Sequence, residues 1–537
     1  MERQHLYFTV FILGILIGSS LYLSWSVDTG MGQITVQRLS LEREIGRPVE
    51  ILVYQPRDEA LGGLLEPTPI ILSIHGLADS KEGMYPFNIE LARRNFTVVA
   101  IDLPGHGDST LTFDATDFDA MAEDAYFALR HVQTTFSNVD NETYGIVSYS
   151  FGFRVGIELT DFPIAPSAFA AVGDVGQMAL SQYSNLPANL TVKAGFGASI
   201  VSETTTWLIQ NIQGDDQLAI TRDPNTQIYF NKTLATIMGS IFLLISTIPI
   251  MMLVYDTLSD RLRPRRIPLK TNSLSFQKTF LLSSLMGIAT MVIFVVTISA
   301  GSILGSRAWL NFLFGTDLLI SYYLGLIGLL ILMIFFLGMN ETQLALSSVG
   351  VERSRIREPV FDIVKSLAIV AIPIFWIMIW LAIAGLPETM SPHSYILFLR
   401  WPVGIKAFDT FVLAVLSIPF LVVEAAWVRG LLLSHRDWNE QAPMYLNDIK
   451  KTAFALVARL AASSVCAVLF AFSLGGLGLT GGTLVVLGYL LILIATIQVL
   501  ITFLTVFTAM RFENTWPAVI LSAFLLALVI VTSLPLI

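Results

Sequence analysis

Residues 144–153 read Tyr-Gly-Ile-Val-Ser-Tyr-Ser-Phe-Gly-Phe, and they place a serine, Ser150, directly after a short apolar run. Small residues lie on both sides of it, with Ser148 two positions before and Gly152 two positions after. A strand, a tight turn with a serine at its apex and a following helix form the arrangement that presents a serine as a nucleophile. Because a serine is a weak nucleophile until a base takes its proton, the pattern predicts acyl chemistry only if a base is near.

Two further turns precede Ser150, and each follows an apolar run. The run 69–74 leads into 75–77, which reads His-Gly-Leu, and the run 95–101 leads into 102–109, which reads Asp-Leu-Pro-Gly-His-Gly-Asp-Ser. Short apolar runs bounded by turns are typical of buried parallel strands. In open α/β sheets the carboxyl ends of parallel strands share one edge, so we expect both turns to lie near Ser150.

The segments around these turns predict the elements that position them. Residues 116–136 have helical spacing, and 144–149 form the strand that leads to the serine. A later strand is predicted at 168–174, a final strand and its loop at 189–197, and a helix at 201–212. Strands that alternate with crossover helices predict an α/β domain with a mainly parallel sheet covered on both faces.

In their order and approximate spacing, the His-Gly turn, the 102–109 turn and the serine turn resemble the α/β-hydrolase family, over roughly residues 47–220. The resemblance implies that the backbone amides of Leu77 and Phe151 form an oxyanion hole. Amides aimed at a developing oxyanion accelerate such reactions by roughly 10²–10³-fold. The other residues that the resemblance places near the site are His75, Gly76, His106, Tyr149 and Gly152.

The sequence departs from the family pattern after Ser150. The family order is serine, then an acid, then a histidine. Asp174, at the end of a predicted strand, is the candidate acid. In the final loop, where the resemblance implies a histidine, Gly195 and Gly197 stand instead, and no histidine lies between Ser150 and the next long apolar run.

The histidines elsewhere have other expected roles. His75 and His106 are predicted to orient loops near the site rather than to act as its base. His131 is predicted on a solvated helix surface, and His393, on a later connection, reaches the site only if that connection folds over it. Cys466 is the only cysteine and lies in an apolar run, so no metal cluster is expected, and we expect no cofactor.

The composition indicates a membrane protein. Hydrophobic residues make up 54% of the 537 residues and charged residues 14%, and the mean hydropathy is +0.68. Soluble proteins carry about 25% charged residues. The lipid bilayer is therefore an expected partner, and the net charge of −9 argues against nucleic acid.

The chain divides into three predicted parts. Residues 1–30 contain an apolar segment that is either a cleaved signal peptide or an uncleaved signal anchor. Its apolar length of about 20 residues and its poor cleavage site favour the anchor. Residues 31–232 have mixed polarity and form the hydrolase-like part, here called the outer domain. Residues 233–537 form a membrane domain with about eight apolar runs, near 234–255, 279–302, 318–337, 366–385, 408–428, 453–474, 482–510 and 517–536.

Charge in the connections predicts the orientation. Arginine and lysine gather in 256–278, 338–365 and 429–451, whereas the alternate connections hold few. Because basic connections stay in the cytoplasm, these three are predicted inside. The outer domain then lies on the extracytoplasmic side of a multi-pass membrane protein, with the amino terminus inside. Four Asn-x-Ser/Thr sequons in the outer domain, at Asn95, Asn141, Asn189 and Asn231, agree with that side.

Glu424 is an acid within an apolar run, with Arg429 five positions later. An intramembrane acid is a candidate functional residue because burying it in lipid is costly. We predict a structural ion pair between the two, with the Arg429 side chain reaching the membrane interface.

The sequence leaves several functions open. The first is a membrane-anchored hydrolase that cleaves an ester, thioester or amide through Ser150, with a lipid-like or amphiphilic substrate suggested by the tether. The second is a non-catalytic pseudohydrolase that binds or assembles. The third is an accessory domain of a transporter or membrane protease. The missing histidine favours the second, and the retained serine and glycine-containing turns favour the first.

Overall fold

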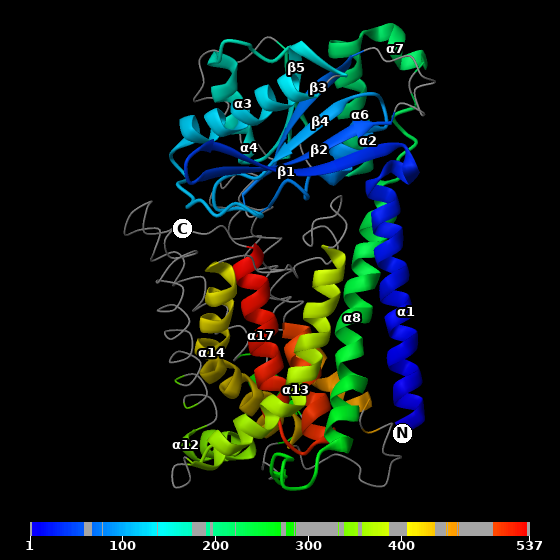
Figure 1. Ribbon diagram of the computed structural model, residues 1–537. Helices are drawn as coiled ribbons and strands as arrows, with labels where there is room; N and C mark the ends of the chain where they lie inside the picture. The colour runs from blue at the N-terminus through cyan, green and yellow to red at the C-terminus, as the bar shows by residue number, and fades with distance from the viewer. Residues whose placement is uncertain are drawn as a thin grey trace.

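The computed structural model describes residues 3–57, 67–77, 79–136, 138–173, 189–193, 197–220, 222–269, 275, 277–283, 285, 331, 334, 338–352, 357–385, 405–434, 447, 449–458, 460 and 498–533. They form an α/β domain that lies at one end of a group of long apolar helices (Figure 1).

A seven-stranded sheet is the centre of the outer domain, with the strand order β1-β2-β4-β3-β5-β6-β7. The first two strands, β1 (Ile34–Glu44) and β2 (Arg47–Pro56), form an antiparallel hairpin, and β2 also pairs antiparallel with β4 (Thr97–Ile101). All other neighbours are parallel and involve β3 (Thr68–Ile74), β4, β5 (Val139–Tyr149), β6 (Ala168–Val172) and β7 (Leu190–Lys193). The predicted α/β fold with a mainly parallel sheet is confirmed, and the hairpin is an addition to it.

Helices cover both faces of the sheet and bury its inner strands. Every residue of β4 and of β6 is buried. One face carries α3 (Phe118–Thr135), α4 (Gly152–Glu158) and η3 (Leu159–Asp161), and the other carries α2 (Tyr85–Ala92) and α6 (Ala198–Leu208), which continues as the π-helical turn η4 (Ile209–Gln213). A last short helix, α7 (Asp215–Ile220), follows.

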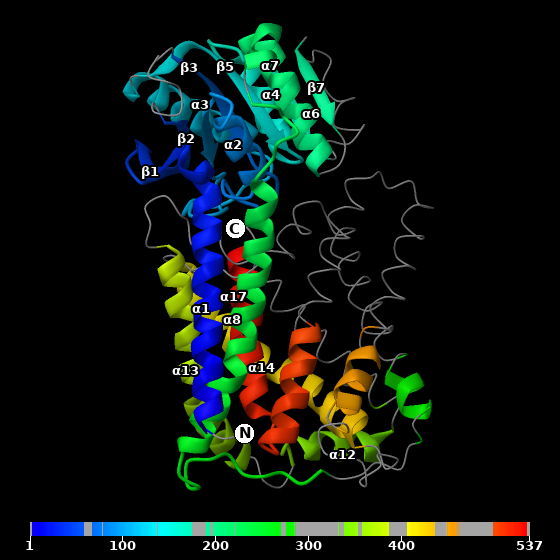
Figure 2. The same ribbon diagram turned by 90° about the vertical axis from the view of Figure 1, so that its right-hand side faces the viewer.

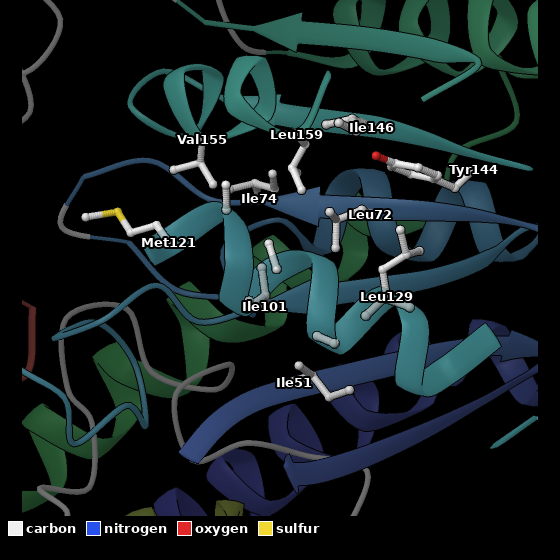
Figure 3. Close-up of a cluster of buried hydrophobic side chains, with 14 of the residues drawn as sticks. Ile51, Leu72, Ile74, Ile101, Met121, Leu129, Tyr144, Ile146, Val155 and Leu159 are labelled. Atoms are coloured by element: carbon white, nitrogen blue, oxygen red, sulfur yellow. The ribbon is translucent and has the colours of Figure 1, made fainter. Parts of the chain in front are cut away.

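Figure 3 shows the core on the α3 face, where Leu72 and Ile101 of the sheet meet Leu129 of α3. All three side chains are fully buried. Burying one such side chain stabilises a fold by about 1.5–3 kcal/mol. Asp117 starts α3, because its carboxylate accepts a hydrogen bond from the Ala120 amide at 3.2 Å.

Four described helices are long and apolar enough to cross a membrane. They lie in α1 (Arg3–Asp28), α8 (Tyr229–Thr257), α13 (Arg357–Ala384), and α14 (Ile405–Ala426) with its π-helical continuation η6 (Trp427–Leu433). Shorter apolar helices are Gln498–Arg511 and α17 (Trp516–Ser533), and α12 (Met339–Ser348) is a connecting helix. Most of the predicted runs 279–302, 318–337 and 453–474, and the first half of 482–510, lie outside the described residues.

Figures 1 and 2 show that α1 and α8 lie side by side and both join the outer domain at the same end. The amino terminus, α12 and the segment after α8 lie at the opposite end. Parts of the basic connections 256–278 and 338–365 thus lie at the same end, opposite the outer domain. The charge pattern predicts that the basic connections share one side of the membrane. The side of the membrane on which each end lies stays a prediction.

Arg429 is enclosed by other segments of the chain, and its position at a membrane interface stays a prediction. Its side chain is fully buried in η6 and donates hydrogen bonds to the carbonyl oxygens of Ile267 and, at 2.9 Å, of Glu513. Among the described residues no ion pair joins it to Glu424, which is also buried. The connections after α8 and before α17 fold against this helix end. Their carbonyl oxygens, rather than water, accept the hydrogen bonds of the buried Arg429 guanidinium.

Candidate active site

Ser150 lies in a strained turn between β5 and α4. Its φ is +48°, in the left-handed region that residues with a side chain rarely adopt. Its amide donates to the carbonyl of Val172 at 2.9 Å, and its own carbonyl accepts from the Phe153 amide at 3.0 Å. The predicted strand, tight turn and helix are therefore present, with the half-buried serine at the apex.

Gly152 allows this turn to pack against the end of β3. A β-carbon at position 152 would lie 2.6 Å from the carbonyl oxygen of His75, so no larger residue fits there without a shift. Gly76 makes a second close approach, because a β-carbon there would lie 2.8 Å from the ring of Tyr149. The His-Gly turn and the serine turn are thus in direct contact, and the two glycines are the reason.

The imidazole of His75 is engaged at both nitrogens. Its Nε2 accepts a hydrogen bond from the Leu103 amide at 3.0 Å, so its Nδ1 carries the proton and donates to the Gly76 carbonyl at 2.7 Å. The ring therefore joins the turn after β3 to the turn after β4. It cannot take a proton from Ser150 without losing one of these bonds, which makes it a loop-orienting residue.

His106 is buried beside His75, in the turn after β4. Its Nδ1 donates to the Pro104 carbonyl at 2.9 Å, and its ring centre lies 5.0 Å from that of His75. On its other side it meets Phe113 edge-to-face at 4.8 Å, and Phe113 in turn meets Phe151 at 5.7 Å. His106 therefore supports the residue after the nucleophile through apolar ring contacts.

The two candidate oxyanion residues lie on one side of the core. Leu77 and Phe151 are both partly buried and both pack against the hydrophobic cluster between the sheet and α3. Leu77 follows the His-Gly turn and Phe151 precedes α4, so their amides belong to two segments that the glycine contacts hold together. An oxyanion hole requires two amides that converge on one point, and the role of these two amides stays a prediction.

Tyr149 lies directly before Ser150, and its ring packs between two glycines. Its ring contacts Gly76 and Gly173, where a β-carbon would lie 2.8 Å and 2.6 Å away respectively. Burial raises the pKa of the Tyr149 hydroxyl, and the nearby carboxylate of Asp79 raises it further. The phenol therefore stays neutral at physiological pH and is a poor base.

A buried charge cluster, which the sequence did not predict, lies beside these turns. The fully buried Lys81 ammonium binds the carboxylates of Asp102, of Asp108 at 2.7 Å and of Glu82 at 3.1 Å. Burial lowers the pKa of Lys81, but the three carboxylates more than offset this, so its pKa is raised. The sequence signal was the charged run at 79–82 in a turn between two buried strands.

Several predicted site residues lie outside the described part of the chain. These are Asp174, Gly195 and His393. His131 lies on α3, half-buried, with its ring 6.5 Å from that of Phe127. Among the described residues no hydrogen bond joins the Ser150 hydroxyl to an imidazole, and no group of three histidine, cysteine or acidic side chains is placed to hold a metal.

The turn after β3, at the edge of the sheet that carries Ser150, lies close to the ends of α1 and α8. The turn after β3 ends at Tyr85, whose hydroxyl hydrogen-bonds Thr233 in the second turn of α8. The ammonium of Lys232 lies 4.7 Å from the centre of the Tyr85 ring and pairs with Asp28, the last residue of α1. The loop that carries the candidate oxyanion amide thus adjoins the ends of both helices that enter the outer domain.

A sequence model of one family matches this region. The model, described as serine aminopeptidase, S33, matches residues 66–158, which run from β3 through the serine turn and α4. A search of curated proteins found no relative of this chain.

Solved structures resemble the outer domain only in part. An epoxide hydrolase from Vigna radiata is 19% identical with a TM-score of 0.21, over 27% of this chain and 39% of that one. A thermostable carboxyl esterase from Bacillus coagulans, solved with glycerol, is 19% identical with a TM-score of 0.22, over 26% and 44%. The chain therefore spans less than half the length of these enzymes. With the match to residues 66–158 and the strand, turn and helix around Ser150, the outer domain has an α/β-hydrolase-like fold.

Proposed function

We propose that the outer domain is an extracytoplasmic, membrane-anchored serine hydrolase that cleaves an ester, thioester or amide through an acyl-Ser150 intermediate. The observation that carries this proposal is the φ of +48° at Ser150. A glycine would adopt that conformation without strain, whereas another residue pays about 1–3 kcal/mol. Strain of this kind is concentrated at functional sites, and here it presents a hydroxyl at the edge of the sheet.

The geometry supports a two-step reaction. The Ser150 oxygen attacks the substrate carbonyl, and the negative charge that develops on the carbonyl oxygen is stabilised by the Leu77 and Phe151 amides. The leaving group departs with a proton, and water then hydrolyses the acyl-serine. Because both His75 nitrogens are engaged, the proton of Ser150 passes to water or to a group outside the described residues, so we expect slow acylation. Serine hydrolases that lack a triad member still accelerate hydrolysis by about 10³–10⁴-fold.

The substrate class follows from the position of the site. The turn after β3 adjoins the ends of α1 and α8, and both helices are long and apolar enough to span a bilayer. A substrate held at the bilayer surface would meet this edge of the sheet first. We therefore propose an acylated amphiphile or lipid as the substrate.

Labelling with a fluorophosphonate tests the proposal, because the reagent forms a stable bond only with an activated serine. We expect slow labelling of the full-length protein that is lost in Ser150→Ala. Ser148→Ala is the matched control: Ser148 lies on the same strand, is fully buried, and should leave the labelling rate unchanged. Equal background labelling of the wild type and Ser150→Ala would contradict the proposal, and rapid labelling would point to a base, with His393→Ala as the next variant.

One observation favours a second function, a non-catalytic binding or assembly module. His75, whose backbone carbonyl contacts the serine turn, has its imidazole fixed by two backbone groups, so this ring serves structure. In this case an amphiphile should bind the wild type and Ser150→Ala equally, with no acyl adduct in intact-protein mass spectrometry. A role as an accessory domain of a transporter predicts the same result at Ser150.

A further inference from the structure

Lys81 has no part in the chemistry above, yet it is the most completely enclosed charge beside the site. Its side chain is fully buried and lies in the turn that carries the candidate oxyanion residue Leu77. We infer that Lys81 is a positioning residue: it ties the turn after β3 to the turn after β4 and thereby fixes the direction of the Leu77 amide. The inference rests on the proposed hydrolase function and identifies what holds its oxyanion hole in place.

Asp102 is the centre of this connection. One of its carboxylate oxygens accepts the Lys81 amide at 2.8 Å, and the other accepts the Lys81 ammonium and, at 2.8 Å, the Asp108 amide. The ammonium also reaches the Asp108 carboxylate at 2.7 Å. Residues of two turns, separated along the chain by a helix and a strand, thus share one buried carboxylate and one buried ammonium.

The backbone around the Asp102 carboxylate leaves little room for this side chain to move. A β-carbon at Gly107 would lie 2.2 Å from the Asp102 carboxylate, and Gly107 has a φ of +53°. The backbone after β4 therefore wraps closely around this carboxylate. Removing the ammonium would leave Asp102 and Asp108 as buried negative charges without their shared cation, and the turns must move to reach water.

A short path of hydrogen bonds leads from this cluster to Leu77. Leu103 directly follows Asp102, and its amide holds Nε2 of His75 at 3.0 Å. Nδ1 of the same ring holds the Gly76 carbonyl at 2.7 Å. In a planar trans peptide the carbonyl of residue 76 and the N–H of residue 77 point in opposite directions. Fixing the Gly76 oxygen therefore fixes where the Leu77 N–H points.

The decisive variant is Lys81→Met, with Lys232→Met as its matched control. Both lysines are almost fully buried and both have acidic partners, but Lys232 lies on α8 and pairs with Asp28. In full-length protein, we expect Lys81→Met to lower the rate constant of fluorophosphonate labelling about 10–100-fold, somewhat less than the loss of a whole oxyanion donor. Lys232→Met should lower the melting temperature but leave the labelling rate within about twofold of the wild type.

Asp108→Asn is a milder variant in case Lys81→Met does not fold. The Asp108 side chain is 12% exposed, and its loss leaves the Lys81–Asp102 contact intact. We expect a severalfold slower labelling with little change in melting temperature. Losses that are equal in Lys81→Met and Lys232→Met, or that follow the melting temperature across all three variants, would overturn the inference.

Backbone hydrogen exchange separates this inference from the hydrolase function itself. Lys81→Met should speed exchange in the peptide that spans residues 75–84, and Lys232→Met should not. If wild-type Ser150 does not label at all, the proposed function fails, yet the exchange result still decides whether Lys81 holds the turn. Unchanged exchange in Lys81→Met would refute the positioning role whether or not the protein is an enzyme.

Discussion

Ser150 combines a reactive group with an unfavourable backbone conformation. Its neighbours Ser148 and Gly152 allowed the turn to be predicted from the sequence, because only small residues permit such close packing. The engagement of the His75 ring was not predictable, since its partners are the backbone groups of Leu103 and Gly76, and these leave no signal in residue types. For the same reason the sequence named the candidate oxyanion residues but not Lys81, which holds their turn.

Substitution at position 150 should separate strain from chemistry. Glycine removes the penalty of a positive φ, whereas alanine keeps it, so Ser150→Gly should be more stable than Ser150→Ala by about 1 kcal/mol. Both variants lack the hydroxyl and should not label. Chemical denaturation of the two proteins side by side measures the difference, and equal midpoints would mean that the turn relaxes when the serine is lost.

Among the elements, α2 has a role that the sequence did not indicate: it joins the outer domain to the long apolar helix α8. One carboxylate oxygen of Glu90 accepts the amides of Ile228 at 2.7 Å and Tyr229 at 3.3 Å, and so caps the start of α8. The other oxygen holds Arg93 and Arg94, each at 2.7 Å. The sequence predicted the later helices and strands to within a few residues. It did not predict the short helix α2 or the β1–β2 hairpin, because neither carries a motif.

Glu90→Ala should therefore destabilise the outer domain by about 3 kcal/mol, because it removes a helix cap and leaves the buried Arg94 without its carboxylate. Glu123→Ala is the control: this glutamate also pairs with an arginine, Arg43, but its side chain is 55% exposed. Its loss should cost less than about 1 kcal/mol. Denaturation midpoints of the two variants give the comparison, and similar shifts would rule out a structural role for the α2–α8 contact.

Three elements each carry a buried or partly buried tyrosine, and these tyrosines predict how the stability of the outer domain falls at high pH. Burial raises the pKa of Tyr85 on α2 to about 12 and also raises the pKa values of Tyr54 on β2 and Tyr144 on β5. In the unfolded chain these hydroxyls ionise near pH 10, so the unfolded state loses protons first and stability falls as pH rises above that value. Tyrosinate absorbance should thus show a late component that appears together with unfolding. A single smooth titration near pH 10 before unfolding would contradict it.

Across the whole molecule, the described parts of two basic connections and the outer domain lie at opposite ends of the described helices (Figure 2). With Cys466→Ser as the background, one cysteine at each end tests which side each end occupies. Ile45→Cys lies in the fully exposed turn between β1 and β2, and Leu262→Cys lies in the connection after α8, with 54% of Leu262 exposed. An impermeant maleimide should label intact cells at position 45 and, only after permeabilisation, at position 262. The reverse result would invert the predicted topology.

The pairing of Asp28 with Lys232 has a consequence for how the outer domain unfolds. These residues are 204 positions apart in the chain, and they meet where α1 and α8 pack together. As long as the two helices stay together in the bilayer, the chain between them is a closed loop whether it is folded or not. In the chain-entropy view of crosslinks, closing a loop of this length removes about 5 kcal/mol of disorder from the unfolded state. The bilayer would then act on this domain as a disulfide does on a small secreted protein, and detaching the domain from its helices would return that entropy to the unfolded chain and lower the stability of the domain.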